Sequence, residues 1–154
     1  MFEKILIPKN RIGILRGIKN EIEKETQTKI DIDEDVSING EAINLLTAMN
    51  IVKAIGRGFP FEDAMELLDE DVTLCIISLP HNRKALIRVK SRIIGAKGKA
   101  KRNIERLTNT KLSIYGKTVS IIGEYENAEK ARVAVEKLIT GSSHKNVYMF
   151  LVGK

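Results

Sequence analysis

Two glycines three residues apart, Gly95 and Gly98, lie in a segment that is rich in lysine and arginine. Small residues at a corner between two helices could simply make a turn. They could also let a bulky anion lie against the main chain. A side chain at either position would hold a phosphate away from the N–H groups at the start of the following helix, where the helix dipole favours an anion. These glycines, with Ala96 and Lys97 between them, therefore form a candidate phosphate-contacting loop.

The charges around this loop fit contact with a polyanion. From Arg83 to Lys111 the chain has 11 Lys and Arg residues against one acidic residue, Glu105. A basic stripe through a glycine corner is the pattern expected for phosphate contact. Aliphatic residues are expected to line the groove beside the loop, although plain core packing explains them equally well. The predicted contact residues are Arg88, Arg92, Ile94, Gly95, Ala96, Lys97, Gly98, Lys99, Lys101, Arg102, Lys111, Leu112 and Ile114.

Catalytic motifs are weak in this sequence. A P-loop needs G-x-x-x-x-G-K-S/T, and GAKGKA has the wrong spacing and no hydroxyl after the lysine. The DEDV stretches that begin at Asp33 and Asp69 could offer carboxylates to a metal-dependent nuclease, but solvated turns before strands explain them better. His81 and His144 have no partner at metal-ligand spacing. We expect a protein that is not an enzyme and that uses no cofactor or metal.

The net charge of +6 conceals two different halves. Residues 1–71 carry 9 Lys and Arg against 15 Asp and Glu, and residues 72–154 carry 17 against 5. Such asymmetry indicates that the second half meets a polyanion while the first meets protein, or nothing. No run approaches the roughly 18 apolar residues of a membrane span, and the lone Cys75 fits buried packing in a reducing compartment. We expect a cytoplasmic location without membrane contact.

The chain contains two copies of one unit. With an offset of 82 residues, Ile12–Ile32 falls on Ile94–Ile114. With an offset of 83, VSINGE at 36–41 meets VSIIGE at 119–124. The one-residue change falls between two strands, where a turn of different length costs little. The repeat predicts a duplicated domain.

Each copy has the pattern β-α-α-β-β-α. Apolar runs rich in Ile and Val predict strands, helical spacing follows the glycine corner, and two alternating segments precede a last amphipathic helix. The strands are expected at KILIP, KIDID and VSI in the first copy and at VTLCIISL, KLSIY and TVSIIG in the second, with last helices at EAINLLTAMNIVKAI and NAEKARVAVEKLI. The predicted fold class is α+β, with a three-stranded sheet in each copy and helices packed on one face.

The expected domains are residues 1–58 and 72–154, joined by a connector helix over 59–71 whose apolar stripe packs onto both. In the second copy, NRKALIRVKSRII favours a helix that starts near Asn82, and a second strand at Leu86 to Val89 is the alternative. The tail HKNVYMFLVGK adds either a strand or a partner contact, and the sequence does not decide between them. No aromatic stacking platform is evident, so bases would be held by shape and by edge hydrogen bonds.

The KH module has this element order, and its mark is a GXXG loop that clamps about four nucleotides by their backbone. Here that loop would be Gly95-Ala96-Lys97-Gly98, and the two copies resemble tandem type I KH domains. The first copy departs from the pattern, because Arg16 stands where the second glycine should be and the following NEIEKE is acidic. We expect this degenerate domain to serve packing or protein contact, and the second domain to bind single-stranded RNA.

The runs RIIGAKGKAKRNIERLTNTKLSI and GEYENAEKARVAVEKLITGSSHKNVY, with the connector GRGFPFEDAMELL, resemble the Partner-of-Nob (Dim-two) family of small-subunit ribosome assembly proteins. The short length is similar to the archaeal members, and a degenerate first KH domain is typical of the family. The resemblance implies rRNA processing and ribosome biogenesis, with binding near the 3′ end of (pre-)16S rRNA. It also implies contact with the Nob endonuclease and with translation initiation factor two alpha. The alternative is a protein–protein adaptor whose GXXG loop is vestigial.

Overall fold

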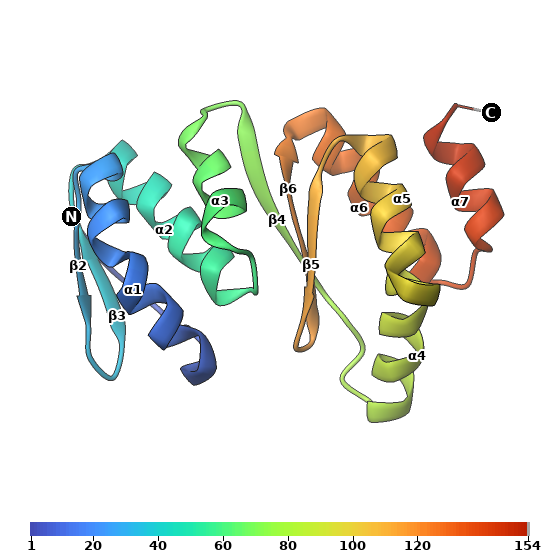
Figure 1. The fold of residues 1–154 in the computed structure, drawn as a ribbon, viewed down its shortest axis with the longest axis horizontal. Helices are drawn as coiled ribbons and strands as arrows, with labels where there is room; N and C mark the ends of the chain where they lie inside the picture. The colour runs from blue at the N-terminus through green and yellow to red at the C-terminus, as the bar shows by residue number, and fades with distance from the viewer. Residues whose placement is uncertain (154) are drawn as a thin grey trace. The chain divides into compact units, whose positions relative to one another are not determined.

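Two three-stranded antiparallel sheets organise the chain, one in each of two units (Figure 1). The units are Met1–Glu70 and Asp71–Lys154, and the computed structural model describes residues 1–153. In both sheets the last strand in the sequence lies in the centre, with the order β1-β3-β2 in unit 1 and β4-β6-β5 in unit 2. The predicted α+β class, with one such sheet in each copy, is confirmed.

Unit 1 is a helix-covered sheet followed by a short helical segment. Helices α1 and α2 pack against each other, and the segment after them packs against α2. The expected connector helix is therefore a single α-helical turn continued by a 3-10 turn, with Phe59 and Leu67 buried. The elements are β1 (Phe2–Ile5), α1 (Lys9–Thr26), β2 (Lys29–Ile32), β3 (Val36–Asn39), α2 (Ala42–Gly56), α3 (Phe61–Ala64) and η1 (Met65–Leu68).

The first helical segment of unit 1 differs from the expected pair of helices. Helix α1 runs without interruption through Gly13 and Arg16, where the sequence predicted a corner. A corner of this kind needs a left-handed residue at its second glycine position, and the Cβ of Arg16 disfavours that conformation. One helical face also buries Leu15 and Ile22, which favours a continuous helix. The order in unit 1 is consequently β-α-β-β-α.

Unit 2 has the expected β-α-α-β-β-α order and one further helix. Helix α4 begins after Asn82, whose Oδ1 accepts a hydrogen bond from the Ala85 N–H at 3.1 Å, so the segment Leu86 to Val89 is helical and the strand alternative does not hold. The elements are β4 (Val72–Ser78), α4 (Arg83–Ile94), η2 (Ala96–Gly98), α5 (Lys99–Thr108), β5 (Lys111–Tyr115), β6 (Thr118–Glu124), α6 (Tyr125–Ile139) and α7 (His144–Leu151).

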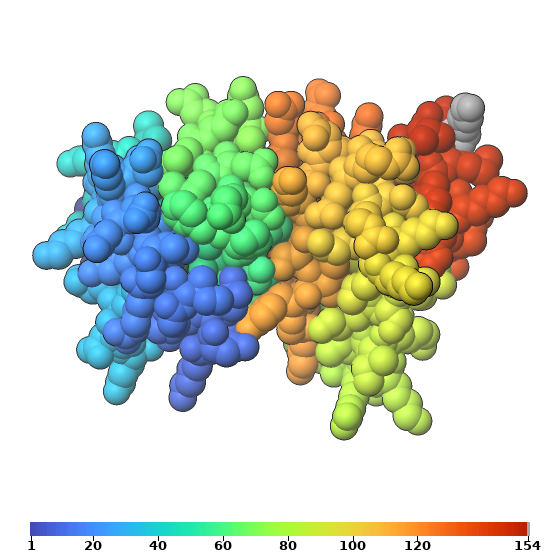
Figure 2. Space-filling model, in the orientation of Figure 1, coloured from blue at the N-terminus to red at the C-terminus, as the bar shows by residue number. Residues whose placement is uncertain are grey.

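The C-terminal tail forms helix α7, which settles the question of whether it adds a strand. Ser143 caps the helix, because its Oγ accepts a hydrogen bond from the Asn146 N–H at 3.1 Å. Val147 is fully buried in the core of unit 2. Helix α7 packs against α5 and α6, and it lies beside α5 on the surface (Figures 1 and 2).

The core of unit 2 lies between one face of its sheet and the helices. The register pairs both Cys75 and Leu112 with Ile121, so these three side chains share a face. They pack with Val89 and Ile104 from α4 and α5. Burial raises the pKa of the Cys75 thiol above its ordinary value, and its contact with this core fits the packing role expected for it. No helix among residues 1–153 combines the length and apolarity needed to cross a bilayer.

The internal repeat is visible as a duplicated corner between a helix and a strand. In each copy a buried threonine at the end of the helix donates to the carbonyl four residues earlier at 2.6 Å. The same hydroxyl hydrogen-bonds at 2.7 Å with a second threonine two residues later. The pairs are Thr26 and Thr28 in unit 1, and Thr108 and Thr110 in unit 2. This match at an offset of 82 confirms the repeat.

A glutamate completes each corner. Glu23 Oε2 accepts a hydrogen bond from the Ile30 N–H at 2.7 Å, and Glu105 Oε2 accepts from the Leu112 N–H at 2.9 Å. The one acidic residue of the basic segment therefore has a structural use. The hairpin turns differ, because the ladder of unit 2 adds the pair Tyr115 and Thr118 before its turn. This difference lies where the offset changes from 82 to 83.

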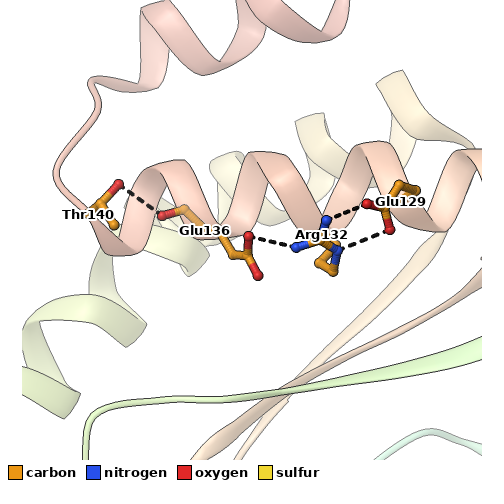
Figure 3. A network of polar contacts seen from close by, with 4 residues as sticks. All are labelled: Glu129, Arg132, Glu136 and Thr140. Atoms are coloured by element: carbon orange, nitrogen blue, oxygen red, sulfur yellow. Dashed lines mark hydrogen bonds and ion pairs between the residues drawn. The ribbon is translucent and has the colours of Figure 1, made fainter.

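An ion-pair network runs along the surface of α6 (Figure 3). Arg132 donates from Nε and Nη2 to the Glu129 carboxylate, the first at 3.0 Å, and from Nη1 to Glu136 Oε2 at 2.7 Å. Thr140 Oγ1 donates to the Glu136 carbonyl at 3.1 Å. The hydrogen bond from Arg132 lowers the pKa of Glu129, and the two carboxylates raise the pKa of Arg132 above its ordinary value. These pairs link neighbouring turns of α6.

Candidate nucleic-acid interface

The corner between α4 and α5 is built by two glycines with positive φ. Gly95 has φ 74° and ψ 176°, and Gly98 has φ 77° and ψ 13°. Lys97, between them, also has a positive φ of 54°. A Cβ added at Gly95 would lie 2.7 Å from both the backbone nitrogen and the Cβ of Ala100. Glycine is therefore required at position 95 by its backbone conformation and by its contact with the first turn of α5.

Main-chain hydrogen bonds hold this corner in one shape. The Gly95 N–H donates to the Ser91 carbonyl at 2.8 Å, and the Gly98 N–H donates to the Gly95 carbonyl at 3.2 Å. The Lys99 N–H donates to the Ala96 carbonyl. These bonds use N–H groups at both ends of the loop, whereas Ala96 at its tip is exposed. The tip is where an approaching phosphate can come closest to the main chain.

Cationic side chains surround the exposed tip. Lys97 and Lys99 are both exposed and extend from the loop and from the first turn of α5. Arg102 is also exposed, and its Nη1 donates to the Lys97 carbonyl at 2.6 Å, so this arginine braces the loop as well as adding charge. Lys101 is half-buried, and its Nζ lies 3.6 Å from Glu105 Oε1. The predicted cations 97 to 102 are therefore gathered by the structure around one corner.

Two further predicted cations lie on the flanking elements. Arg88 is exposed on α4, and Lys111 is exposed at the start of β5. A hollow of about 310 Å³ lies where α5 meets β5. Its lining includes Arg106 and Asn109, which the sequence reasoning did not select. The spacing of Arg102 and Arg106 at i and i+4 places both on one face of α5, and this signal could have identified Arg106.

Arg92, another of the predicted contact residues, makes hydrogen bonds within unit 2. Its Nε donates to the Leu138 carbonyl at 3.1 Å, and its Nη2 donates to the Ser142 carbonyl. His144 Nε2 in turn donates to the Arg92 carbonyl at 2.8 Å. Arg92 thus joins the end of α4 to the end of α6 and the start of α7. Its charge stays in the basic region, but these donors are occupied within the protein.

The three predicted aliphatic residues differ in exposure. Leu112 is 4% exposed and belongs to the hydrophobic core. Ile114 is partly buried and packs against that core, and Ile94 at the end of α4 is also half-buried. Leu112 is therefore a core residue of the sheet. Of the three, only Ile94 and Ile114 have enough exposed side-chain surface to contact a ligand.

The fold and the loop define a class of protein. Residues 71–154 match the family model for the second KH domain of PNO1-type proteins, described as a eukaryotic type KH-domain (KH-domain type I). Unit 2, with its GXXG loop between two helices, is a type I KH domain. The chain belongs to the Partner-of-Nob (Dim2) family of KH-domain proteins.

Relatives that match along nearly the whole chain agree with this assignment. The KH domain-containing protein MJ0443 of Methanocaldococcus jannaschii is 40% identical over 163 residues, covering 97% of this chain and 72% of that protein. The crystal structure of Dim2p from Pyrococcus horikoshii OT3 has a TM-score of 0.94 and 43% identity, covering 100% of this chain and 99% of that one. The structure of the a/eIF2alpha–aDim2p–rRNA complex from the same organism gives 0.92 and 42%, covering 99% and 93%.

Proposed function

We propose that this protein binds single-stranded RNA through unit 2 during biogenesis of the small ribosomal subunit, near the 3′ end of (pre-)16S rRNA. The observation that carries the proposal is the exposed tip of the GXXG loop, held between two glycines with positive φ in the most basic segment of the chain. The similar aDim2p of Pyrococcus horikoshii, solved with a/eIF2alpha and rRNA, supports it.

The proposed binding mode follows from the geometry of the loop. RNA phosphates lie against Ala96 and Lys97, near the start of α5, where the helix dipole favours an anion. The side chains of Lys97 and Lys99 neutralise phosphate charge from two sides of the tip. A KH loop holds about four nucleotides in this way. Arg88 and Lys111 extend the contact along α4 and β5. Arg92 and Leu112 contribute by holding the surrounding structure in place, Arg92 through hydrogen bonds and Leu112 through core packing.

Unit 1 has a different part in the proposal. Its α1 is a continuous helix without a glycine corner, and residues 1–71 carry an excess of acidic side chains. An acidic surface repels a phosphate backbone, so unit 1 is assigned to protein contact. The partners we propose for the chain are the Nob endonuclease and translation initiation factor two alpha. The a/eIF2alpha in the complex of the Pyrococcus relative supports the second of these.

Fluorescence anisotropy tests the RNA contact directly. The ligand is a labelled oligonucleotide that matches the 3′ end of small-subunit rRNA, and a scrambled sequence serves as its control. The variant Ala96→Asp/Lys97→Asp places two carboxylates at the tip and leaves the core unchanged. We expect it to abolish binding, and we expect the wild-type log–log salt slope to be near −0.7 per phosphate neutralised.

A charge-matched variant separates local contact from net charge. Asn20→Asp/Lys24→Asp makes the same charge change at exposed positions on α1. We expect it to bind the oligonucleotide like the wild type. If instead the Ala96→Asp/Lys97→Asp protein binds as well as the wild type, the loop is only a corner. The adaptor function, with a vestigial GXXG loop, would then be the better account.

A further inference from the structure

Helix α7 and the GXXG loop border a hollowed surface whose α7 side the RNA contacts above do not use. A hollow of about 260 Å³ lies between the loop and α7, and a second of about 440 Å³ continues between α5 and α7. Tyr148 lines both, so we treat them as one feature, the α7 trough. Its lining also includes Gly95, Ala96, Lys99, Arg106, His144 and Lys145.

The α7 trough combines an aromatic surface with positive charge. The rings of His144 and Tyr148 are stacked, with centroids 6.2 Å apart and planes at 24°. Lys99, Arg106 and Lys145 are cations in the lining, and none of the described residues that line the trough is acidic. Aromatic faces that accept bases, beside cations that accept phosphates, are the combination used by single-strand binding surfaces.

The wall that α7 provides is fixed by contacts with the rest of unit 2. His144 donates to the Arg92 carbonyl at 2.8 Å, and Val147 is fully buried in the core. Lys137 Nζ lies 5.1 Å from the centre of the Phe150 ring, which adds a cation–π contact from α6. These contacts fix helix α7, and the stacked His144 ring supports the Tyr148 ring. A base that stacks on Tyr148 therefore meets a surface that is already ordered.

The position of the trough selects its occupant. One end of it is lined by Gly95 and Ala96, and Ala96 is one of the residues against which the proposed RNA phosphate lies. The next nucleotide of the bound RNA strand, attached to that phosphate, therefore lies in the trough. An acidic peptide would match the cations, but it would compete with the same phosphate for the loop. RNA is therefore the occupant that both the charge and the position favour.

We infer that the α7 trough is a second nucleotide subsite, in which a nucleotide next to those clamped by the GXXG loop stacks its base on Tyr148. Lys99 and Lys145 contact the phosphates on either side of that base. The inference rests on the proposed RNA binding by unit 2. Tyr148 would then be the aromatic platform that was not evident in the sequence, because it lies on α7 and not on one of the KH elements.

The test compares a short oligonucleotide of about four nucleotides with versions extended by about two nucleotides at either end. In the wild type, extension at one of the two ends should lower Kd about 10-fold relative to the short oligonucleotide, equivalent to about 1.4 kcal/mol. This is the gain expected when one base stacks on one aromatic ring. Tyr148→Leu should remove this gain and leave the Kd of the short oligonucleotide unchanged, whereas Tyr148→Phe should keep the gain. Tyr125→Leu, at an exposed tyrosine of α6, is the matched control and should bind both oligonucleotides like the wild type.

The outcomes separate this subsite from the proposed function. If the Ala96→Asp/Lys97→Asp variant still binds the short oligonucleotide, RNA binding by the loop fails. If that variant loses binding but extension brings no gain in the wild type, the subsite is overturned and the function stands. Equal weakening of short and extended oligonucleotides by Tyr148→Leu also overturns the subsite. A 2-aminopurine base in the extension, whose fluorescence should be quenched by stacking in the wild type, gives a reading that does not depend on the Leu variant folding.

Discussion

Replacing Gly95 by alanine should destabilise unit 2 by about 3 kcal/mol. Its φ of 74° and ψ of 176° lie in a region open essentially to glycine alone, and a residue with a Cβ there costs roughly 1–3 kcal/mol. The new Cβ would also meet the Ala100 nitrogen at 2.7 Å, and this backbone atom cannot swing aside as a side chain can. Relieving such an overlap costs roughly another 1–3 kcal/mol. Both ranges describe the strain of placing a Cβ at this position, so they are not fully additive and about 3 kcal/mol is expected.

The internal repeat provides a matched control with the opposite sign. Gly13 is the equivalent of Gly95 at the offset of 82, but it lies inside α1, and an added Cβ would have nothing within 4 Å. Alanine is favoured over glycine inside a helix by roughly 0.5–1 kcal/mol. Gly13→Ala should therefore stabilise unit 1 by about that amount. The two substitutions are chemically identical, so a difference in sign isolates the backbone conformation as the cause.

Urea unfolding can follow unit 2 separately. The chain has no tryptophan, and its three tyrosines, Tyr115, Tyr125 and Tyr148, all lie in unit 2. Tyrosine fluorescence thus reports unit 2, while circular dichroism reports both units, which matters because a chain of two units need not unfold in one step. With a urea m-value of about 1–3 kcal/mol/M, Gly95→Ala should lower the fluorescence midpoint by about 1 M or more. An unchanged midpoint, or a Gly13→Ala protein that is less stable than the wild type, would refute the reasoning.

Two further predictions use the polar contacts of unit 2. Glu105→Ala removes the acceptor of the Leu112 N–H and should cost about 1–3 kcal/mol by tyrosine-monitored unfolding. The equivalent Glu23→Ala in unit 1 should leave that transition unchanged, and an equal effect would contradict the assignment. Glu129 has a lowered pKa when folded, so its stabilising contribution is present above its unfolded pKa and is lost as pH falls through the folded one. Wild type and Glu129→Gln should therefore differ in Tm near pH 7, and the difference should shrink as the pH falls below about 4.3, the ordinary pKa of a glutamate. A difference that stays constant with pH would sink the idea.

Local patterns were sufficient to predict most of unit 2. Asn82 followed by Leu86, Val89 and Ile93 at helical spacing carries both the cap and the apolar face of α4, and the structure shows both. The glycine spacing likewise placed the corner before α5, because only glycine adopts the conformation found at Gly95 without strain. These features depend on residues within about three helical turns of each other, so the sequence alone contains them.

The missed features depend on residues far apart in the sequence. Arg92 donates to a carbonyl 46 residues away and accepts from a histidine 52 residues away, and neither partner can be read from its neighbourhood. Helix α7 has a single fully buried side chain, Val147, which is too little for a periodic pattern. The cap at Ser143 was its one local signal. In unit 1 the glycines of α1 suggested a corner, but burial of Leu15 by the rest of the unit favours the continuous helix.

The loop at residues 95–98 has its final conformation in the folded protein, before any ligand binds. Its main-chain hydrogen bonds, and the bond from Arg102 to the Lys97 carbonyl, fix the dihedral angles of the loop as the unit folds. The entropy of ordering these residues, about 1–2 kcal/mol for each, is lost once on folding and is not lost again at each encounter. An RNA strand that binds this loop, as proposed above, meets a conformation that is already fixed. Binding then needs no closing step, and no contact free energy is spent on ordering the loop.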